Sequence, residues 1–253
     1  MQTNFSGGKV MQPVLEITNF KKLYRNGRGV KDLSLTVNKG DIVGLLGPNG
    51  SGKTTTMKAI CGMTAPDSGT IMIFGNDVAD NIEKALENAG FLIEAPAIYG
   101  AATAEQNLKM AAGYYKIGND RIDKVLDIVK LSPFKNDRAD RFSMGMKQRL
   151  GIALALLSNP GFLVLDEPFN GLDIEGVVHI RELILKLSEE YGTTFLISGH
   201  IAPELEKICT HTAVIHEGYL LAYDTLDGAL KFHPSLEDYY LALVREAEGS
   251  IEL

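Results

Sequence analysis

The chain has 253 residues, of which 45% are hydrophobic and 23% are charged, and its formal net charge is −7. These totals are ordinary for a globular protein that buries a substantial core. The acidic balance argues against a general nucleic-acid binder, which needs a basic surface to attract the phosphate backbone.

The chain opens with a polar stretch, residues 1–12, that contains Ser-Gly-Gly and lacks the apolar core of a signal peptide. We expect it to be a flexible leader. Short β-rich runs then recur along the sequence. Three of them predict strands over residues 14–20, 33–37 and 70–74. Three others are continuously apolar, as in strands buried on both faces, and cover residues 42–46, 162–165 and 194–197.

A different pattern covers residues 94–159, which are mostly helical in character. Within this stretch, Asn119 and Asp120 can cap a helix whose apolar positions follow the 3.6-residue period. These positions are Ile122, Val125, Leu126 and Val129. Near the end of the chain, residues 235–244 predict an amphipathic helix that packs on the core, with a regulatory or dimer contact as the alternative. The sequence therefore predicts an α/β core interrupted by a helical insert.

Residues 47–54 read Gly-Pro-Asn-Gly-Ser-Gly-Lys-Thr and match the phosphate-loop pattern G-x-x-x-x-G-K-[ST]. The motif follows an apolar strand and precedes a predicted helix over residues 55–61, which is the context that the pattern requires. Its glycines let backbone N–H groups turn toward phosphates, and the helix N-terminus adds its positive end. Lys53 is expected to reach the β- and γ-phosphates, and the Thr54 hydroxyl to ligate Mg²⁺. The full set of predicted nucleotide-binding residues in this loop is Asn49, Gly50, Ser51, Gly52, Lys53, Thr54 and Thr55.

A second apolar strand, residues 162–165, ends in two acids, Asp166 and Glu167. The C-terminal ends of parallel strands face the ligand crevice, so both acids should emerge beside the phosphate loop. We predict that Asp166 holds Mg²⁺ and that Glu167 polarises the water that attacks the γ-phosphate. A simple helix-start signal is the alternative interpretation of two acids after a strand.

The segment before that strand, residues 142–149, reads Phe-Ser-Met-Gly-Met-Lys-Gln-Arg and resembles the signature of the ABC ATPases, usually written LSGGQ. Ser143 and Gly145 are retained, whereas Phe142, Met144 and Met146 depart from the commonest form. Ser143 can cap the apolar helix predicted over residues 145–157, so an ordinary N-cap is the alternative. The resemblance implies that this segment contacts the γ-phosphate held by a second protomer.

Further motifs extend the resemblance over nearly the whole chain. The sequence Pro-Phe-Asn-Gly-Leu-Asp, ending at Asp173, is similar to the D-loop of the family, and His200 follows a strand as the switch histidine does. The resemblance implies that His200 contacts the γ-phosphate. Tyr24 stands where the family places an aromatic that stacks on adenine, although it could instead pack a β-hairpin. Glu94 occupies the place where the family usually carries a glutamine at the metal, and we expect it to contact Mg²⁺ or its waters.

The resemblance implies a P-loop NTPase core with a mixed, mostly parallel sheet, an antiparallel β region at the N-terminus and an inserted helical subdomain. We assign the ATPase domain to residues 13–230, with the helical subdomain at about 94–159, and a C-terminal helical extension to residues 231–253. The expected ligands are ATP and Mg²⁺.

The Leu-Ile-Glu stretch at Glu94, combined with the form of the signature, resembles the ATPase subunits of bacterial lantibiotic-immunity and bacitracin-resistance exporters. This resemblance implies a peripheral ATPase at the cytoplasmic face of the membrane that pairs with a second ATPase subunit, most simply as a homodimer. It would power an integral membrane permease and would not bind nucleic acid. The alternatives are a soluble ABC ATPase of DNA repair, chromosome maintenance or ribosome function, a nucleotide switch with weak hydrolysis, and a transporter of another drug, lipid or ion.

Overall fold

The computed structural model describes residues 12–249. Residues 1–11 of the predicted leader lie outside the described residues, as do residues 250–253 of the predicted C-terminal extension.

The described chain forms one mixed sheet with the strand order β5-β4-β1-β2-β10-β9-β3-β8-β7-β6. The strands are β1 Pro13–Leu23, β2 Gly29–Asn38, β3 Ile42–Leu46, β4 Ser68–Ile73, β5 Asn76–Asp77, β6 Ala89–Leu92, β7 Phe162–Leu165, β8 Thr194–Gly199, β9 His211–His216 and β10 Tyr219–Thr225. The run from β9 through β3, β8 and β7 to β6 is parallel, whereas β2, β1, β4 and β5 pair antiparallel. The α/β core and the antiparallel N-terminal region are thus joined in a single sheet.

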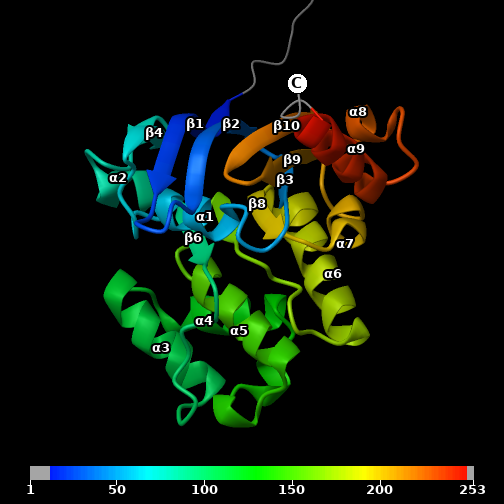
Figure 1. The fold of residues 1–253 in the computed structure, drawn as a ribbon. Helices are drawn as coiled ribbons and strands as arrows, with labels where there is room; N and C mark the ends of the chain where they lie inside the picture. Colours follow the sequence, from blue (N-terminus) through cyan, green and yellow to red (C-terminus); the bar gives the residue numbers. More distant parts are fainter. Residues whose placement is uncertain (1–11, 250–253) are drawn as a thin grey trace, which may run out of the picture.

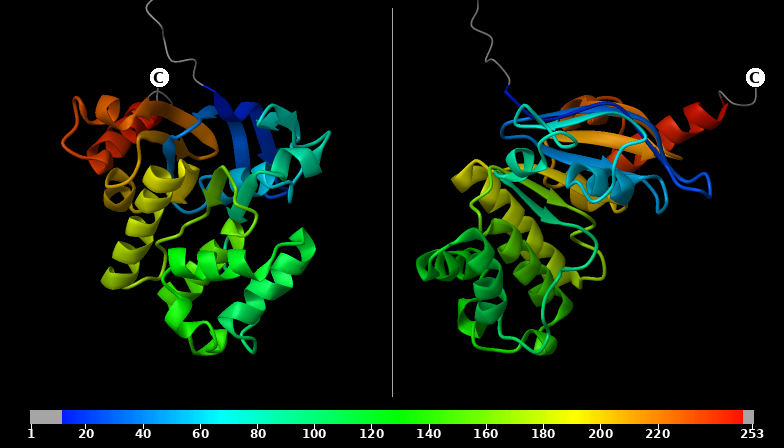
Figure 2. Two further views of the ribbon diagram at one scale, coloured as in Figure 1. Left: turned by 180° about the vertical axis from the view of Figure 1, so that it is seen from behind. Right: turned by 90° about the vertical axis from the view of Figure 1, so that its left-hand side faces the viewer.

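The helices fall into two groups (Figures 1 and 2). Those that accompany the sheet are α1 Lys53–Ile60, α2 Ile82–Leu86, α6 Ile174–Tyr191, α7 Ala202–Glu206, α8 Leu226–Leu230 and α9 Leu236–Gly249. The helices α3 Ala104–Tyr115, α4 Asn119–Ile128 and α5 Met144–Leu156 lie between β6 and β7 in the chain. They form a separate lobe, at the bottom of Figure 1, on the opposite side of the molecule from α9.

The central strands are buried on both faces, which explains their uninterrupted apolar sequence. In β3, Val43 and Leu45 pack into the apolar cluster that contains α1, whereas Ile42 and Leu46 pack into the cluster that contains α5 and α6. Fully burying each such side chain is worth about 1.5–3 kcal/mol. This burial fixes the end of β3, from which the phosphate loop departs.

The start of α4 differs from its prediction. The helix begins at Asn119, and its N-cap is Gly118, which makes no side-chain cap. Asn119 therefore lies inside the first turn and does not cap it. The predicted apolar positions of this helix are nevertheless all buried, because the helical period and not the cap sets which face meets the lobe core.

At the end of the described chain, α9 packs on the core through the buried residues Leu236 and Tyr239. The Tyr239 hydroxyl donates to Asp224 Oδ2 at 3.3 Å, and the Leu236 N–H donates to Glu206 Oε2 at 2.7 Å. The helix is thus tied to β10 and to α7.

The two cysteines, Cys61 and Cys209, are free thiols. Cys209 is buried under α7, and burial raises the pKa of its thiol far above the usual value. A buried thiol whose ionisation is disfavoured in this way is a poor nucleophile and a poor metal ligand.

Candidate functional site

The loop between β3 and α1 is shaped by glycines that a side chain could not replace. Gly50 and Gly52 have φ angles of 85° and 114°, in the left-handed region that favours glycine. A Cβ atom on Gly47 would lie 2.2 Å from the Ile215 carbonyl oxygen, so β9 presses directly on the start of the loop. The loop is therefore held in one tight turn around the N-terminus of α1.

The inside of this turn offers hydrogen-bond donors. Gly52 is the N-cap of α1 and provides no side-chain cap for the first-turn N–H groups, which have no acceptor within the helix. The Ser51 hydroxyl is buried and has no partner among residues 12–249. Unsatisfied donors at a helix N-terminus suit a bound phosphate, so the loop fits the nucleotide that its sequence predicts.

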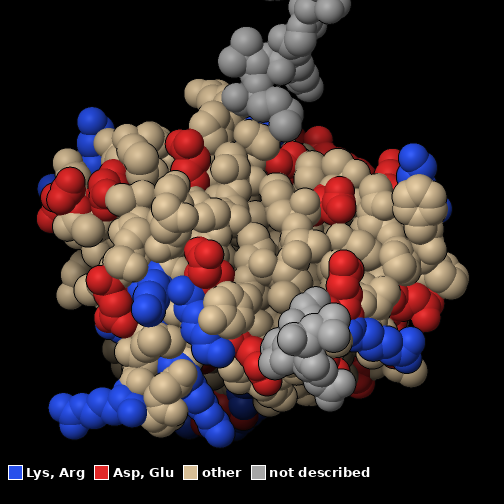
Figure 3. Space-filling model, turned by 45° about the horizontal axis from the view of Figure 1, so that its top comes forward, with Lys and Arg blue, Asp and Glu red and all other residues tan. Residues whose placement is uncertain are grey.

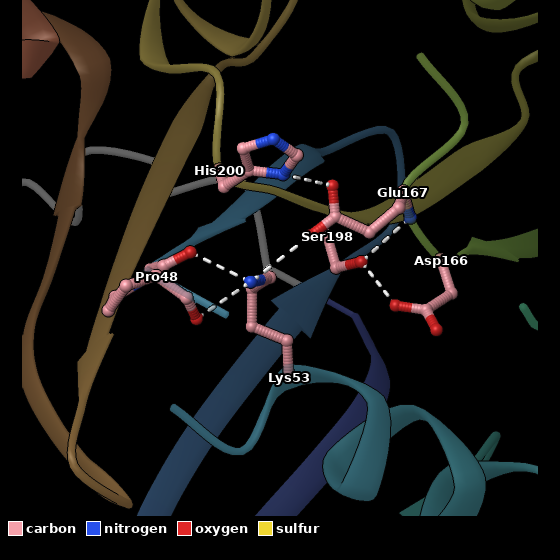
Figure 4. Close-up of polar contacts among 7 residues, drawn as sticks. Pro48, Lys53, Asp166, Glu167, Ser198 and His200 are labelled. Atoms are coloured by element: carbon pink, nitrogen blue, oxygen red, sulfur yellow. Dashed lines mark hydrogen bonds and ion pairs between the residues drawn. The ribbon is translucent and has the colours of Figure 1, made fainter. Parts of the chain in front are cut away.

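Lys53 is almost fully buried beneath the loop, at 5% exposure. Its ammonium donates to the carbonyl oxygens of Gly47 at 2.7 Å and Pro48 at 3.1 Å, and it forms an ion pair with Glu167 Oε1 at 3.1 Å (Figure 4). The Lys53 ammonium thus lies between the carbonyl oxygens of the phosphate loop and the Glu167 carboxylate after β7.

The two acids after β7 are organised by Ser198 on the neighbouring strand β8. The Ser198 hydroxyl donates to Asp166 Oδ1 at 2.5 Å and accepts from the Glu167 backbone N–H at 2.9 Å (Figure 4). Glu167 has a φ angle of 49°, unusual for a residue other than glycine, and such backbone strain is often found at functional sites. One hydroxyl therefore fixes both the buried Asp166 carboxylate and the backbone that carries Glu167.

We expect Ser198→Ala to lower kcat for ATP hydrolysis by about 10- to 100-fold, because one charge-assisted hydrogen bond, worth roughly 1.5–3 kcal/mol, is lost at Asp166. Steady-state hydrolysis by the purified chain measures this. Ser188→Ala on α6 is the matched control, and equal rates for the two variants would show that Ser198 does not support the site.

His200 follows β8 and lies beside Glu167. Its Nδ1 is 2.7 Å from Glu167 Oε2, so Glu167 is held between the imidazole on one side and Lys53 on the other (Figure 4). The predicted base and the predicted switch histidine are thus in direct contact, although 33 positions separate them in the sequence.

A cavity of about 290 Å³ opens over the phosphate loop. Tyr24 lines it from the turn after β1, and Glu167 lines it from the end of β7. The side chain of Tyr24 is 43% exposed, and its backbone N–H donates to the Arg28 carbonyl oxygen at 2.8 Å. The ring therefore borders the cavity, as a surface on which a base can stack would. The remaining lining residues are Asn26, Arg28, Gly29, Asn49, Gly50, Gly52, Lys53, Thr54, Thr55 and Asn170.

Three predicted nucleotide-binding residues lie elsewhere. Ser143 is the N-cap of α5 and accepts from the Met146 N–H at 3.2 Å, and Asp173 is the N-cap of α6 and accepts from the Gly176 N–H at 2.8 Å. A Cβ atom on Gly145 would lie 3.5 Å from the Gly176 Cα atom, so the starts of these two helices are close together. Of the described residues, neither Ser143, Gly145 nor Asp173 lines the cavity over the phosphate loop.

Glu94, the predicted replacement for a glutamine at the metal, follows β6 with a left-handed φ angle of 60°. Its Oε1 is 2.6 Å from the ammonium of Lys58, which projects from α1. The hydrogen bond from Lys58 to Glu94 raises the pKa of the ammonium, against a smaller lowering by burial. The end of β6 is fixed beside the end of β7, because the Asp166 N–H donates to the Leu92 carbonyl oxygen at 2.8 Å.

Ser198 and Lys58 were not predicted to take part in the site. Ser198 could have been noticed as a polar residue near the end of an apolar strand, and Lys58 as a residue one helical turn after Thr54. Neither position identifies its partner: Asp166 lies just after β7, and Glu94 lies just after β6.

The chain is similar to known proteins in both sequence and structure. A family described as ABC transporter matches residues 30–170. The bacitracin transport ATP-binding protein BcrA of Bacillus licheniformis is 43% identical over 235 residues, which are 92% of this chain and 76% of the relative. The lantibiotic transport ATP-binding protein SrtF of Streptococcus pyogenes is 35% identical over 216 residues, 85% of this chain and 93% of the relative. A solved ATP-binding subunit of an ABC transporter superposes with a TM-score of 0.80 at 30% identity and covers 91% of this chain and 99% of the solved one.

Proposed function

Because the chain belongs to the ABC transporter family, as an ATP-binding subunit that hydrolyses ATP, we propose that it powers the export of a peptide antibiotic or another amphipathic compound through a separate membrane subunit. The observation that carries this proposal is the similarity to relatives named for bacitracin transport and lantibiotic transport, which extends over most of each chain.

The nucleotide would occupy the cavity over the phosphate loop. Tyr24 would stack on the adenine, the loop N–H groups would hold the phosphates, and Lys53 would move from its carbonyl partners to the β- and γ-phosphates. In the described structure Lys53 also neutralises Glu167, so its transfer to the phosphates would free the Glu167 carboxylate.

Thr54 and Asp166 offer a hydroxyl and a carboxylate, and oxygen atoms are the ligands that Mg²⁺ prefers. Thr54 and Asp166 would hold the ion, with Glu94 accepting from its waters. A bound Mg²⁺ would neutralise charge on the phosphates as the γ-phosphate is transferred to water. Ser198 would keep the Asp166 carboxylate turned toward the ion, since it already donates to Oδ1.

Glu167 would act as the general base toward the attacking water, and His200 would contact the γ-phosphate. Their 2.7 Å contact supports these roles, because it places the imidazole and the carboxylate at one edge of the phosphate loop. A histidine in this position would contact both the γ-phosphate and the Glu167 carboxylate, and it would lose its phosphate contact once the γ-phosphate is transferred to water.

The positions of Ser143, Gly145 and Asp173 support a dimer. All three lie at the starts of α5 and α6 and do not line the cavity of their own chain. A second copy could present its α5 N-terminus, with the positive end of the helix dipole, to the γ-phosphate. ATP would then lie between two chains and hold them together, and hydrolysis would remove the contact.

The membrane partner would be a separate chain, and the ATPase would work at the cytoplasmic face. Among residues 12–249, no helix combines the length and the apolarity that crossing a bilayer requires. The surface that engages the permease would be the Glu94 segment, which contacts α1 through Lys58, together with the adjoining lobe of α3, α4 and α5.

The acidic character of the chain favours this proposal over a nucleic-acid-associated ATPase. Figure 3 shows a face that is mostly uncharged, with scattered acidic residues and with Lys and Arg mainly around its edges. The presence of both Asp166 and Glu167 in ordered positions likewise favours hydrolysis over a switch with weak turnover.

Co-purification tests the proposal. A tagged Glu167→Gln chain is expressed in its native cell, membranes are solubilised gently with ATP present, and the bound proteins are identified. We expect an integral membrane protein in stoichiometric amount. Ribosomal or DNA-repair proteins without a membrane chain would contradict the transport function and leave the ATPase activity standing.

A further inference from the structure

The ion pair between Lys58 and Glu94 joins α1 to the segment after β6, and the two residues are 36 positions apart in the sequence. Lys58 lies four residues after Thr54 in α1, so the two side chains project from the same face of the helix. Thr54 lines the nucleotide cavity. Lys58 is therefore directed along the side of α1 on which the metal would be bound.

Glu94 has a strained backbone, and its side chain is mostly exposed. Its backbone is left-handed, its side chain is 61% exposed, and Lys58 is its polar partner at 2.6 Å. Strained conformations persist where the surroundings hold them. Two residues before Glu94, the Leu92 carbonyl oxygen accepts from the Asp166 N–H. The Glu94 carboxylate itself is held by Lys58.

The ion pair between Lys58 and Glu94 matters for nucleotide binding because the phosphate loop has several carboxylates near it. Asp166, Glu167 and Glu94 bring three carboxylates to a site that must accept a polyanion. Lys53 neutralises Glu167, but it is also the group that the phosphates would draw away. Lys58 neutralises Glu94 from outside the loop, where it remains available after the nucleotide has bound.

We propose that Lys58 is a positioning residue for the nucleotide site, which holds Glu94 beside α1 and cancels the charge of its carboxylate while no Mg²⁺ is bound. This inference rests on the proposed roles of Thr54 and Glu94 at the metal. Without Lys58, the free carboxylate repels the phosphates of a metal-free nucleotide, and a bound Mg²⁺ relieves the repulsion.

The test is a double-substitution cycle on binding. The dissociation constant of the non-hydrolysable analogue adenylyl imidodiphosphate is measured by calorimetry, first in EDTA and then in excess MgCl₂. The variants are Lys58→Met, Glu94→Gln and the double variant. Lys58→Arg serves as the conservative replacement, and Lys109→Met, which breaks the surface pair with Glu105 in α3, is the matched control.

In EDTA, we expect Lys58→Met to raise the dissociation constant by about three- to tenfold, the size of one unscreened charge near the phosphates. The double variant should return to within about twofold of the unmodified chain, because the repelling carboxylate is gone. Lys58→Arg and Lys109→Met should not change binding. In excess Mg²⁺, the effect of Lys58→Met should shrink.

Two results would overturn the inference. Unchanged binding by Lys58→Met in EDTA would show that the pair does not act on the site. An equal loss in Lys58→Met and in the double variant would show that Lys58 attracts phosphate directly, independently of Glu94. A failure of the unmodified chain to bind the nucleotide in either buffer is a distinct result, which would instead overturn the nucleotide-binding role of the cavity.

Discussion

Replacing Lys53 with alanine is expected to raise the dissociation constant for ATP by at least about 100-fold, because charge-assisted hydrogen bonds to two phosphates are lost together, each worth roughly 1.5–3 kcal/mol. The structure adds a second reason. Lys53 binds the carbonyl oxygens of Gly47 and Pro48 and thereby braces the loop from inside. Calorimetry or fluorescent-nucleotide titration of the purified variant measures the effect.

The control for this variant is Lys186→Ala on the outer side of α6, where the side chain is 43% exposed. It removes the same charge from the chain at a distance from the loop, so its affinity for ATP should not change. Lys53→Arg is also informative, since the rigid guanidinium does not fit a pocket shaped around an ammonium. Unchanged ATP affinity in Lys53→Ala would refute the assignment of the phosphate loop.

Replacing Glu167 with glutamine is expected to lower the rate of ATP hydrolysis by about 10²- to 10⁴-fold, the usual contribution of a positioned general base. ATP binding should persist and strengthen, because the amide no longer holds Lys53 away from the phosphates. With the γ-phosphate retained, the variant should accumulate as a dimer in ATP. Single-turnover hydrolysis and light scattering after gel filtration measure the two effects.

Glu189→Gln, at an exposed position of α6, is the matched control and should hydrolyse ATP at the normal rate and remain in its usual association state. The two readouts separate two proposals. Normal turnover by Glu167→Gln would refute its role as base. Slow turnover without an ATP-dependent dimer would leave the base in place and contradict the shared site at the start of α5.

Together these variants divide the site by function. Lys53 is expected to govern whether the nucleotide binds, and Glu167 whether it is cleaved. Ser198 binds the Asp166 carboxylate and the Glu167 backbone N–H. The substitutions at Lys58 and Glu94 test a further property, which is whether the charge of the Glu94 carboxylate is neutralised when nucleotide binds without Mg²⁺. If Lys53→Ala loses ATP binding while Glu167→Gln and Ser198→Ala keep binding and lose turnover, then binding and hydrolysis depend on different residues.

Much of the core could be predicted from the sequence because its signals are contiguous. The apolar runs at residues 42–46 and 162–165 coincide with β3 and β7, since a strand buried on both faces needs no polar position. The glycines and Lys53 of the phosphate loop, and Ser143 at the start of α5, were likewise recognisable, because each motif encodes its own local geometry.

Other elements left no such signal. β6 has four residues, and β10 is only half-buried, so neither shows a continuous apolar run or a clear alternation. β9 was not predicted either, although it supplies the Ile215 carbonyl that presses on Gly47. The capping of α4 was misjudged because two polar residues at its start were equally able to cap it, and the position of the first turn is set by packing.

The sequence by itself predicted the chemistry expected of this protein: the side chains that would bind phosphate and the two acids that follow a strand. It also predicted that residues 42–46 and 162–165 form buried strands, which are β3 and β7. Only the tertiary structure decided which of those groups meet. The order β3-β8-β7 places Ser198 against Asp166 and His200 against Glu167, and the end of β6 brings Glu94 to Lys58. These contacts join segments that are distant in the sequence. Which residues meet depends on the strand order and on the helix packing. Both are set by the burial of the whole core, and no local sequence pattern encodes them.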